Sequence, residues 1–260
     1  MLYELSNGVT YYKDQLHNQL IIFYDQEIER VFDLSDPGDV IELESYRAHL
    51  IKEGQEITKI DAEGHYILPG FIDVHIHGYK GVDVMDANVE SLEIMKKELV
   101  KNGVTSFLAT TMTMGKKSIL DALDAVEKVI VKQEQSDVIG AAIIGVHLEG
   151  PFINNKFKGA QSEKHIIPVD HDMLDRYKDI IKVVTIAPET DGGLETIKKY
   201  KNDMNFSIGH SGAKYEEAME AFEYGACCTT HLFNAMTGLH HRNLGIVGAA
   251  LTSDLSLIHI

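Results

Sequence analysis

The stretch Pro69-Gly-Phe-Ile-Asp-Val-His-Ile-His-Gly78 has the pattern of a strand that follows a turn and ends in two histidines. Because side chains alternate along a strand, Asp73, His75 and His77 share one face. Two imidazoles about 7 Å apart on that face can converge on one divalent ion, with Asp73 one layer deeper in a supporting or packing role. A His-x-His pair alone is equally consistent with polar histidines that enter a loop, so the rest of the chain has to decide.

Further apolar runs alternate with amphipathic segments along the chain. The runs are 71–76, 105–111, 143–148, 183–187, 205–208 and 227–233, with a weaker candidate strand at 246–251. Segments 89–102, 116–132 and 214–224 have apolar residues at helical spacing. We expect Gly103 and Gly225 to end the first and third helices, and Ser211 to cap the third. Strands that are apolar on both faces and alternate with helices predict a parallel sheet covered by helices.

Six or seven such units predict an α/β fold of the (β/α)₈ TIM-barrel type, with a doubly wound sheet as the alternative. Residues 69–260 number 192, whereas a complete barrel typically needs about 250 and at least about 200. We therefore expect an incomplete barrel over 69–260 that lacks its last strand or strands. Residues 1–68 contain short β-prone segments with helical spacing only around 41–50, and they predict a small N-terminal β-sandwich element.

Composition narrows the class of protein. The 24 Lys and Arg residues face 40 Asp and Glu residues, a net charge of −16, which argues against a nucleic-acid or anionic-membrane surface but leaves room for a local basic pocket. The two cysteines, Cys227 and Cys228, are adjacent, so a disulfide between them would cross-link no distant parts of the chain. This favours a reducing cytoplasm. No signal peptide is evident, and no apolar run approaches the roughly 18 residues of a membrane span. We expect a soluble cytoplasmic protein with neither nucleic acid nor membrane as a partner.

Three more predicted strands lead into a side chain that can bind a metal. Run 143–148 leads into Glu149, run 205–208 into His210, and the run from 227 into His231. A single strand-end histidine is more often a surface residue. Four strands that each place His or Glu at the carboxyl end point to one shared site, because barrels carry their active site at that rim. Imidazole and carboxylate together suit Zn²⁺, Fe²⁺, Mn²⁺ or Co²⁺.

Five motifs in this order carry a resemblance to a known family: PGFIDVHIHG, HLEGPF, KGAQ, IGHS and THLFNAM. They resemble the N-acetylglucosamine-6-phosphate deacetylases of the metal-dependent amidohydrolase superfamily. The resemblance runs from about Ile67 to Leu251, and more loosely over the N-terminal region. HLEGPF and THLFNAM are specific to the deacetylases, whereas PGFIDVHIHG marks only the superfamily. The family fold implies a (β/α)₈ barrel beside a small β-sandwich built from both termini.

The resemblance implies a set of metal ligands. Glu149, His210 and His231 match the ligands of the family, and His75 and His77 match a pair that some members keep, which favours two ions over one. Related hydrolases carry a bridging lysine after the fourth strand. Here that strand leads into Ala-Pro-Glu, and Lys182 precedes it at the opposite end, so Glu149 is the expected carboxylate ligand.

The resemblance also implies substrate contacts and a homodimer. The residues that match substrate positions are Ala160, Gln161, Asn234, Ala235 and Arg242. Many members have His at the position of Gln161 and Pro at that of Leu244. In the family the arginine matched by Arg242 reaches the phosphate bound by the neighbouring subunit, and its guanidinium fork suits a phosphate dianion.

The expected reaction removes the acetyl group from N-acetylglucosamine 6-phosphate and yields glucosamine 6-phosphate and acetate, a step of amino-sugar catabolism. It needs an activated water and a proton-shuttling acid–base group. In the family this group is an aspartate at the end of the eighth strand, beyond Ile260, and Asp254 in a turn-like stretch is a poor substitute. We therefore expect no catalytic acid–base residue here, and a polypeptide that alone binds metal poorly and turns over little. The alternatives are another amidohydrolase that acts on a cyclic amide or amine, and an inactive metal-binding or dimerising fragment.

Overall fold

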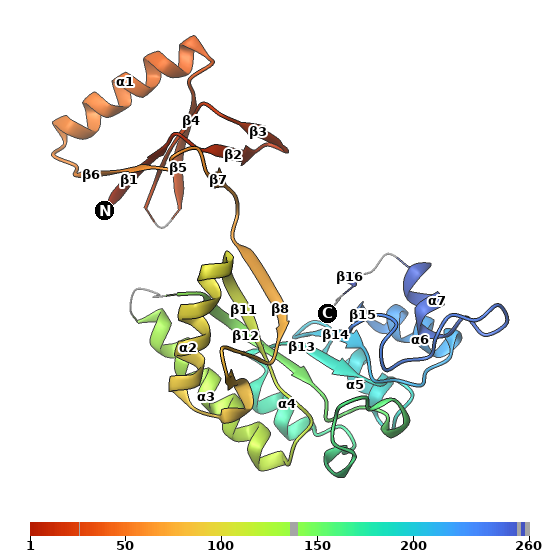
Figure 1. The fold of residues 1–260 in the computed structure, drawn as a ribbon. Coiled ribbons are helices and arrows are strands. Elements are labelled where there is room, and N and C mark those ends of the chain that lie inside the picture. The colour runs from red at the N-terminus through yellow and green to blue at the C-terminus, as the bar shows by residue number, and fades with distance from the viewer. Residues whose placement is uncertain (26, 136–139, 254–255, 258–260) are drawn as a thin grey trace. The chain divides into compact units, whose positions relative to one another are not determined.

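A computed structural model describes the chain as two compact units (Figure 1). The first unit comprises Met1–Pro69 and the second Gly70–Ile260. The residues described are 1–25, 27–135, 140–253 and 256–257.

The first unit consists of two small sheets and one helix. One sheet has the strand order β5-β4-β1-β6 and the other β3-β2-β7. The strands are β1 (Leu2–Ser6), β2 (Val9–Tyr12), β3 (Gln15–His17), β4 (Leu20–Tyr24), β5 (Ile28–Asp33), β6 (Ile57–Asp61) and β7 (Tyr66–Ile67). The helical spacing around 41–50 falls within α1 (Pro37–Lys52), as expected.

Helix α1 is anchored at its start and along its buried face. The Asp36 side chain accepts a hydrogen bond from the backbone N–H of Gly38 and caps the helix before Pro37. Leu43 packs with Phe23 and Phe32 in a small apolar core. This core belongs to the first unit alone and contributes no residue to the site described below.

The second unit is built around a curled, entirely parallel sheet. Its strands lie side by side in chain order from β8 to β16. They are β8 (Phe71–Ile76), β11 (Val104–Thr110), β12 (Ala142–Glu149), β13 (Ile181–Ile186), β14 (Asn205–Ile208), β15 (Ala226–Thr229) and β16 (Ser256–Leu257). Since a doubly wound sheet reverses its strand order at a switch point, this sequential order excludes that alternative among the described strands. The unit is an incomplete TIM-type barrel of the α/β class, as predicted.

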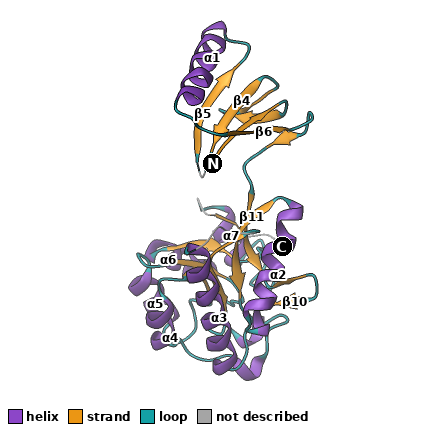
Figure 2. Cartoon of the chain, turned by 90° about the vertical axis from the view of Figure 1, so that its left-hand side faces the viewer, coloured by secondary structure: helices purple, strands orange, loops and turns teal. Residues whose placement is uncertain are grey.

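Helices cover the outer face of this sheet (Figure 2). They are α2 (Val89–Leu99), α3 (Lys116–Glu134), α4 (His171–Tyr177), α5 (Gly193–Tyr200), α6 (Tyr215–Tyr224) and α7 (Gly245–Leu251). A short hairpin, β9 (Gly78–Tyr79) and β10 (Val82–Asp83), follows the His-x-His segment. As expected, α2 continues as a 3₁₀ turn that Gly103 ends with φ 78°, and Gly225 ends α6 with φ 125°.

Three local predictions are wrong. The run 246–251 is helix α7 and not a strand: Ile246, Val247, Ala249 and Ala250 are all buried, and a helix buried on every side has no amphipathic pattern to distinguish it from a strand. Ser211 does not cap α6, because Lys214 occupies the cap position and its N–H donates to Glu217. The run 227–233 leaves the sheet after Thr229.

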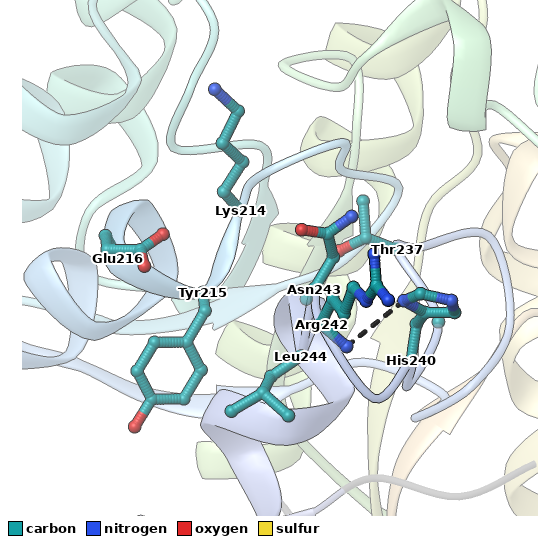
Figure 3. A pocket seen from close by; sticks show the side chains of 10 residues that line it. Lys214, Tyr215, Glu216, Thr237, His240, Arg242, Asn243 and Leu244 are labelled. Carbon is teal, nitrogen blue, oxygen red and sulfur yellow. Dashed lines mark hydrogen bonds between the residues drawn. The ribbon is translucent and has the colours of Figure 1, made fainter.

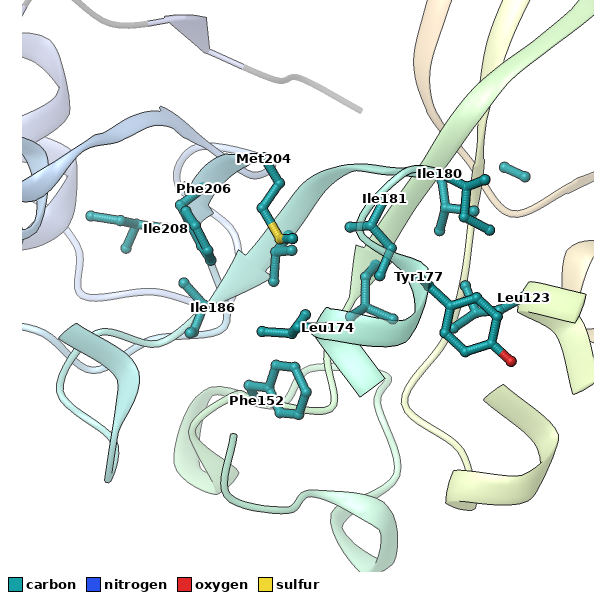
Figure 4. Packing of buried hydrophobic residues seen from close by; sticks show 14 of the residues in the cluster. Leu123, Phe152, Leu174, Tyr177, Ile180, Ile181, Ile186, Met204, Phe206 and Ile208 are labelled. Atoms are coloured by element: carbon teal, nitrogen blue, oxygen red, sulfur yellow. The ribbon is translucent and has the colours of Figure 1, made fainter. Parts of the chain in front are cut away.

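An apolar core fills the space between the sheet and its helices (Figure 4). Its buried side chains include Leu123, Phe152, Leu174, Tyr177, Ile186, Phe206 and Ile208. Met173 is buried in it too. The core holds the strands in register, so the residues at their carboxyl ends have fixed positions. Within the described part of the chain, no helix has both the length and the apolar character needed to cross a membrane.

We expect Phe206→Ala to lower the free energy of unfolding by about 3–5 kcal/mol, because Phe206 is fully buried in β14 and its loss leaves a cavity. The measurement is urea unfolding followed by circular dichroism. Phe233→Ala is the matched control: Phe233 is 60% exposed and should change stability by less than about 0.5 kcal/mol. Equal losses in both variants would contradict the packing described here.

Candidate metal centre

Five metal-binding side chains meet at the carboxyl ends of four strands. His75 lies in β8, and His77 directly follows that strand. Glu149 is the last residue of β12, His210 lies in the loop after β14, and His231 lies in the loop after β15. They form two groups that share Glu149: His75, His77 and Glu149, and Glu149, His210 and His231. The structure thus brings together every side chain that the sequence suggests as a ligand.

Glu149 lies at the centre of this cluster and is only 2% exposed. Its Oε1 atom lies 3.3 Å from Nε2 of His210 and 3.2 Å from Nε2 of His231. Its Oε2 atom lies 3.1 Å from Nε2 of His77 and accepts a 2.8 Å hydrogen bond from the Gln161 amide. One buried carboxylate therefore links both groups.

The imidazoles are held in the tautomer that leaves Nε2 free. Nδ1 of His77, His210 and His231 faces the backbone carbonyl oxygens of Thr110, Phe157 and Asn234 at 3.2, 3.0 and 3.1 Å. A carbonyl oxygen only accepts, so each Nδ1 donates and each neutral ring points an Nε2 lone pair inward. The Nε2 atoms of His210 and His231 then face each other at 3.0 Å. Lone pairs and a carboxylate crowded in this way need a cation between them.

The spacing of these atoms matches the coordination sphere of a small divalent ion. Nε2 of His210, Nε2 of His231 and Oε1 of Glu149 are 3.0, 3.2 and 3.3 Å apart. Tetrahedral ligands at 2.0–2.2 Å from zinc are separated by about 3.3–3.5 Å. In the other group, Nε2 of His75 lies 3.3 Å from Nε2 of His77 and 3.5 Å from Oε1 of Glu149. The residues present therefore fit a divalent metal in either group.

Burial and mutual proximity set the charge of the cluster. Burial lowers the pKa of His75 to about 3, and the nearby His147 ring adds to this, so His75 is neutral at pH 7 as a metal ligand must be. Burial alone would raise the pKa of Glu149, but the bonds to His210, His231 and His77 outweigh burial and lower it far below its usual range. For His77, burial opposes the charged form, yet the bond to Glu149 raises its pKa. A proton on His77 is thus the natural competitor of a cation.

Two of the histidines have an unusual backbone conformation. His210 has φ 48° and His231 has φ 35°, in the left-handed region that a non-glycine residue enters at a cost of about 1 kcal/mol or more. Gly209 lies against Thr230, the residue after β15, because a Cβ atom at Gly209 would come within 2.8 Å of Cβ of Thr230. The His210 carbonyl accepts from the N–H of Asn154 at 2.8 Å. The strained backbone at His210 and His231 and the close contact between Gly209 and Thr230 together set the direction of the two imidazole rings.

A buried chain of hydroxyl groups lies beneath the cluster, and sequence reasoning missed it. His147 Nδ1 donates to the carbonyl of Val74 at 3.0 Å, so its Nε2 accepts from the Thr185 hydroxyl at 2.7 Å. The hydroxyls of Thr185 and Thr230 are 2.7 Å apart, and those of Thr230 and Ser207 are 2.6 Å apart. This chain connects β8, β12, β13, β14 and the end of β15. The available signal was strand alternation, which places His147 on the same face as Glu149.

In the described structure, the Gln161 side chain forms hydrogen bonds with other residues of the protein. Its amide nitrogen donates to Glu149, and its amide oxygen accepts from the backbone N–H of Thr113 at 2.7 Å. It is buried, whereas the neighbouring Ala160 lines an open cavity with Met112. Gln161 therefore fixes the orientation of the Glu149 carboxylate.

The remaining predicted substrate residues lie in the loop after β15. Asn234 is exposed and supplies the carbonyl that orients His231. Ala235 has φ 49°, and its carbonyl accepts from the N–H of Ser211. Both residues therefore lie next to the loops that carry His210 and His231.

Arg242 lines a separate cavity of about 440 Å³ together with Lys214, His240, Asn243 and Thr237 (Figure 3). Among the described lining residues there is no member of the five-residue cluster. The structure of one chain thus does not bring Arg242 and the cluster into one cavity. Asp254, the other candidate named from the sequence, lies outside the described residues.

Three further side chains near strand ends have structural partners. The Asp73 carboxylate accepts from the N–H of His75 at 3.0 Å. Lys182 is the second residue of β13 and does not precede that strand; its Nζ donates to the carbonyl of Asp179, away from the carboxyl ends. Glu189 was not singled out as functional. It accepts from the Ser211 hydroxyl at 2.6 Å, and from Asn154 and the N–H of Gly212, so it joins the loops around His210.

Comparison with known proteins agrees with this geometry. Residues 66–253 match the amidohydrolase family. The chain is 42% identical over 193 residues to N-acetylglucosamine-6-phosphate deacetylase of Bacillus subtilis, covering 72% of this chain and 48% of that protein. It is 36% identical over 209 residues to N-acetylgalactosamine-6-phosphate deacetylase of Escherichia coli O157:H7, covering 78% and 54%. The crystal structure of N-acetylglucosamine-6-phosphate deacetylase from Pasteurella multocida superposes with a TM-score of 0.83 at 29% identity, over 99% of this chain and 64% of that one. The chain spans about half the length of the curated relatives it matches.

We expect Thr230→Val to lower the free energy of unfolding by about 1–3 kcal/mol, because it leaves the buried hydroxyls of Thr185 and Ser207 without their shared partner. Valine has nearly the same shape, so the loss reports the hydrogen bonds and not a cavity. The control is Thr105→Val on the exposed side of β11, which should be close to neutral in urea unfolding. A neutral Thr230→Val would show that the hydroxyl chain does not stabilise the site.

Proposed function

Since the chain belongs to the amidohydrolase family, we propose that its protein is a metal-dependent deacetylase. The proposed reaction hydrolyses the N-acetyl group of N-acetylglucosamine 6-phosphate to glucosamine 6-phosphate and acetate, in amino-sugar catabolism. The observation that carries the proposal is the buried Glu149 carboxylate with four inward-facing imidazoles at strand carboxyl ends. The names of the relatives support the substrate class.

Glu149, His210 and His231 are proposed to hold one divalent ion, and His75 and His77 to hold a second with the other oxygen of Glu149. The donor set suits Zn²⁺, Fe²⁺, Mn²⁺ or Co²⁺. Such an ion supplies Lewis acidity toward a carbonyl oxygen and makes a water nucleophilic near neutral pH.

The chain's own residues orient and protect this centre. The carbonyls of Thr110, Phe157 and Asn234 keep the rings in the ligand tautomer, and Gln161 holds one oxygen of Glu149. Such supporting hydrogen bonds are typically worth 10–100-fold in metal affinity or activity. The buried hydroxyl chain joins His147, Thr185, Thr230 and Ser207 beneath the ligands. Ala160, Asn234 and Ala235, near the carboxyl ends of the strands, are proposed to contact the sugar.

Arg242 is proposed to bind the phosphate of a substrate held by the neighbouring subunit of a homodimer. Two observations support this role. Arg242 lies beside Lys214 and His240 in an open cavity, a cationic group in a chain of net charge −16. None of the described residues that line this cavity belongs to the five-residue cluster of the same chain, as expected if Arg242 serves another subunit. Cys227 and Cys228 form no disulfide, which supports the proposed cytoplasmic location.

We expect Glu149→Gln to abolish metal retention, with an affinity for Co²⁺ or Zn²⁺ lowered more than about 100-fold, because the only carboxylate shared by both groups loses its charge. Metal content after dialysis and competition titration measure this. Glu163→Gln, an exposed carboxylate in a neighbouring loop, is the control and should retain the metal. Unchanged metal content in both Glu149→Gln and His231→Ala would contradict the site.

We expect the whole protein to which this chain belongs, once loaded with metal, to release acetate from N-acetylglucosamine 6-phosphate much faster than from the unphosphorylated sugar, whereas this chain alone should turn over little. Arg242→Ala should lower kcat/KM by about 10–100-fold for the phosphorylated sugar alone, because a charge-assisted fork is lost. Arg242→Lys keeps the charge without the fork and should recover part of the rate. Preference for a cyclic amide or an amine would contradict the proposed substrate.

Mixing subunits tests the dimer separately. If Arg242 serves the partner, a mixture of Glu149→Gln and Arg242→Ala subunits regains up to about one quarter of wild-type activity, since half of the dimers are hybrids with one complete site each. No recovery after subunit exchange would place Arg242 in its own subunit's site or outside the reaction.

A further inference from the structure

Cys227 and Cys228 have an arrangement that a regular strand does not produce. Their Sγ atoms lie 3.6 Å apart, neither residue forms a disulfide, and both are half-buried. Adjacent residues of a strand normally point to opposite faces of the sheet. The contact between the two sulfur atoms therefore needs a local cause.

The cause is a β-bulge in the pairing of β14 with β15. Ala226 pairs with Phe206 and Cys228 pairs with the next residue, Ser207, so Cys227 is the extra residue of β15. A bulge places two residues opposite one and re-aims their side chains. The bulge thus converts two consecutive cysteines into a dithiol that faces one side.

We propose that this dithiol is a chelating site for a soft, thiophilic ligand, a trivalent arsenical. In the binding step both S–H bonds break, two As–S bonds form at one arsenic atom, and the oxygen of an arsenoxide leaves as water with the two protons. No atom changes oxidation state, so no oxidant or reductant is needed. Soft thiolate ligands favour such thiophilic centres over the hard cations of oxygen-rich sites.

The geometry disfavours the competing reaction, an internal disulfide. Consecutive Cα atoms across a trans peptide are about 3.8 Å apart, whereas disulfides join Cα atoms that are usually 4.4–6.8 Å apart. The sulfur atoms at 3.6 Å are also far beyond the S–S bond length of about 2.05 Å. A third atom bonded to both sulfurs bridges this distance without requiring the strand to bend.

Cys227 is set up to react first. The bond to Cys228 is the main reason that the pKa of Cys227 falls to about 7. The Cys227 thiol also lies 3.5 Å from Oδ1 of Asn205, which can accept its proton in a hydrogen bond. A thiol with this pKa is about half thiolate, the reactive form, at pH 7.

The dithiol is separate from the metal centre. It occupies the middle of β15, and His231 follows two residues after that strand ends, about 10 Å along the chain at 3.3 Å per residue. Neither cysteine belongs to a ligand group that contains Glu149. The inference therefore does not rest on the proposed deacetylase function.

The test uses phenylarsine oxide with the reduced protein, followed by intact mass and calorimetry. We expect one arsenic atom to bind per chain. Excess monothiol should leave the adduct intact, whereas a small dithiol should remove the arsenic. Cys227→Ser and Cys228→Ser should each weaken binding more than about 100-fold, because each leaves a single thiol and loses the chelate. Thermal unfolding of both variants checks that they fold.

A comparison of folded and urea-unfolded chains tests the role of the bulge. Preorganised sulfur atoms predict binding at least about 10-fold tighter in the folded chain. Equal affinity in both states, no adduct, or an adduct that survives loss of one cysteine would each overturn the proposal.

Discussion

The site depends on electrostatic crowding around one buried carboxylate. The Nε2 atoms of four histidines each lie within 3.5 Å of a carboxylate oxygen of Glu149, while three of the rings already donate their only proton to backbone carbonyls. Such a concentration of lone pairs is unstable in a low-dielectric interior unless positive charge enters it. The fold supplies rigidity for this arrangement: parallel strands end at one rim, and the apolar core behind them keeps the ends from moving apart.

Sequence patterns predict the arrangement of strands and helices well where two faces of an element differ. Helices such as α3 follow directly from apolar spacing. The same logic fails for 246–251, where residues 246–250 of α7 are all buried and the spacing carries no information. The boundary of the last long run was missed for a related reason, since Leu232 is buried although it has left the sheet.

The candidate site is predictable at the level of strand ends and not at the level of atoms. His210 and His231 could be placed at the rim because they follow apolar runs, but which nitrogen faces inward depends on carbonyls of distant residues such as Phe157. The Thr185–Thr230–Ser207 chain depends on the register between neighbouring strands. The Cys227 bulge is likewise a property of strand pairing, which a single sequence does not contain.

The left-handed backbone at His210 and His231 also restricts how these positions can change over evolution. Asn and Asp tolerate this conformation nearly as well as His does, whereas Val, Ile and Thr do not. Asp and Asn are also oxygen donors, so apart from glycine the replacements that the main chain accepts most readily still offer a ligand atom. Drift or engineering at these two positions is thereby directed toward oxygen-rich centres suited to harder cations such as Mn²⁺, through a single substitution and without rebuilding either loop.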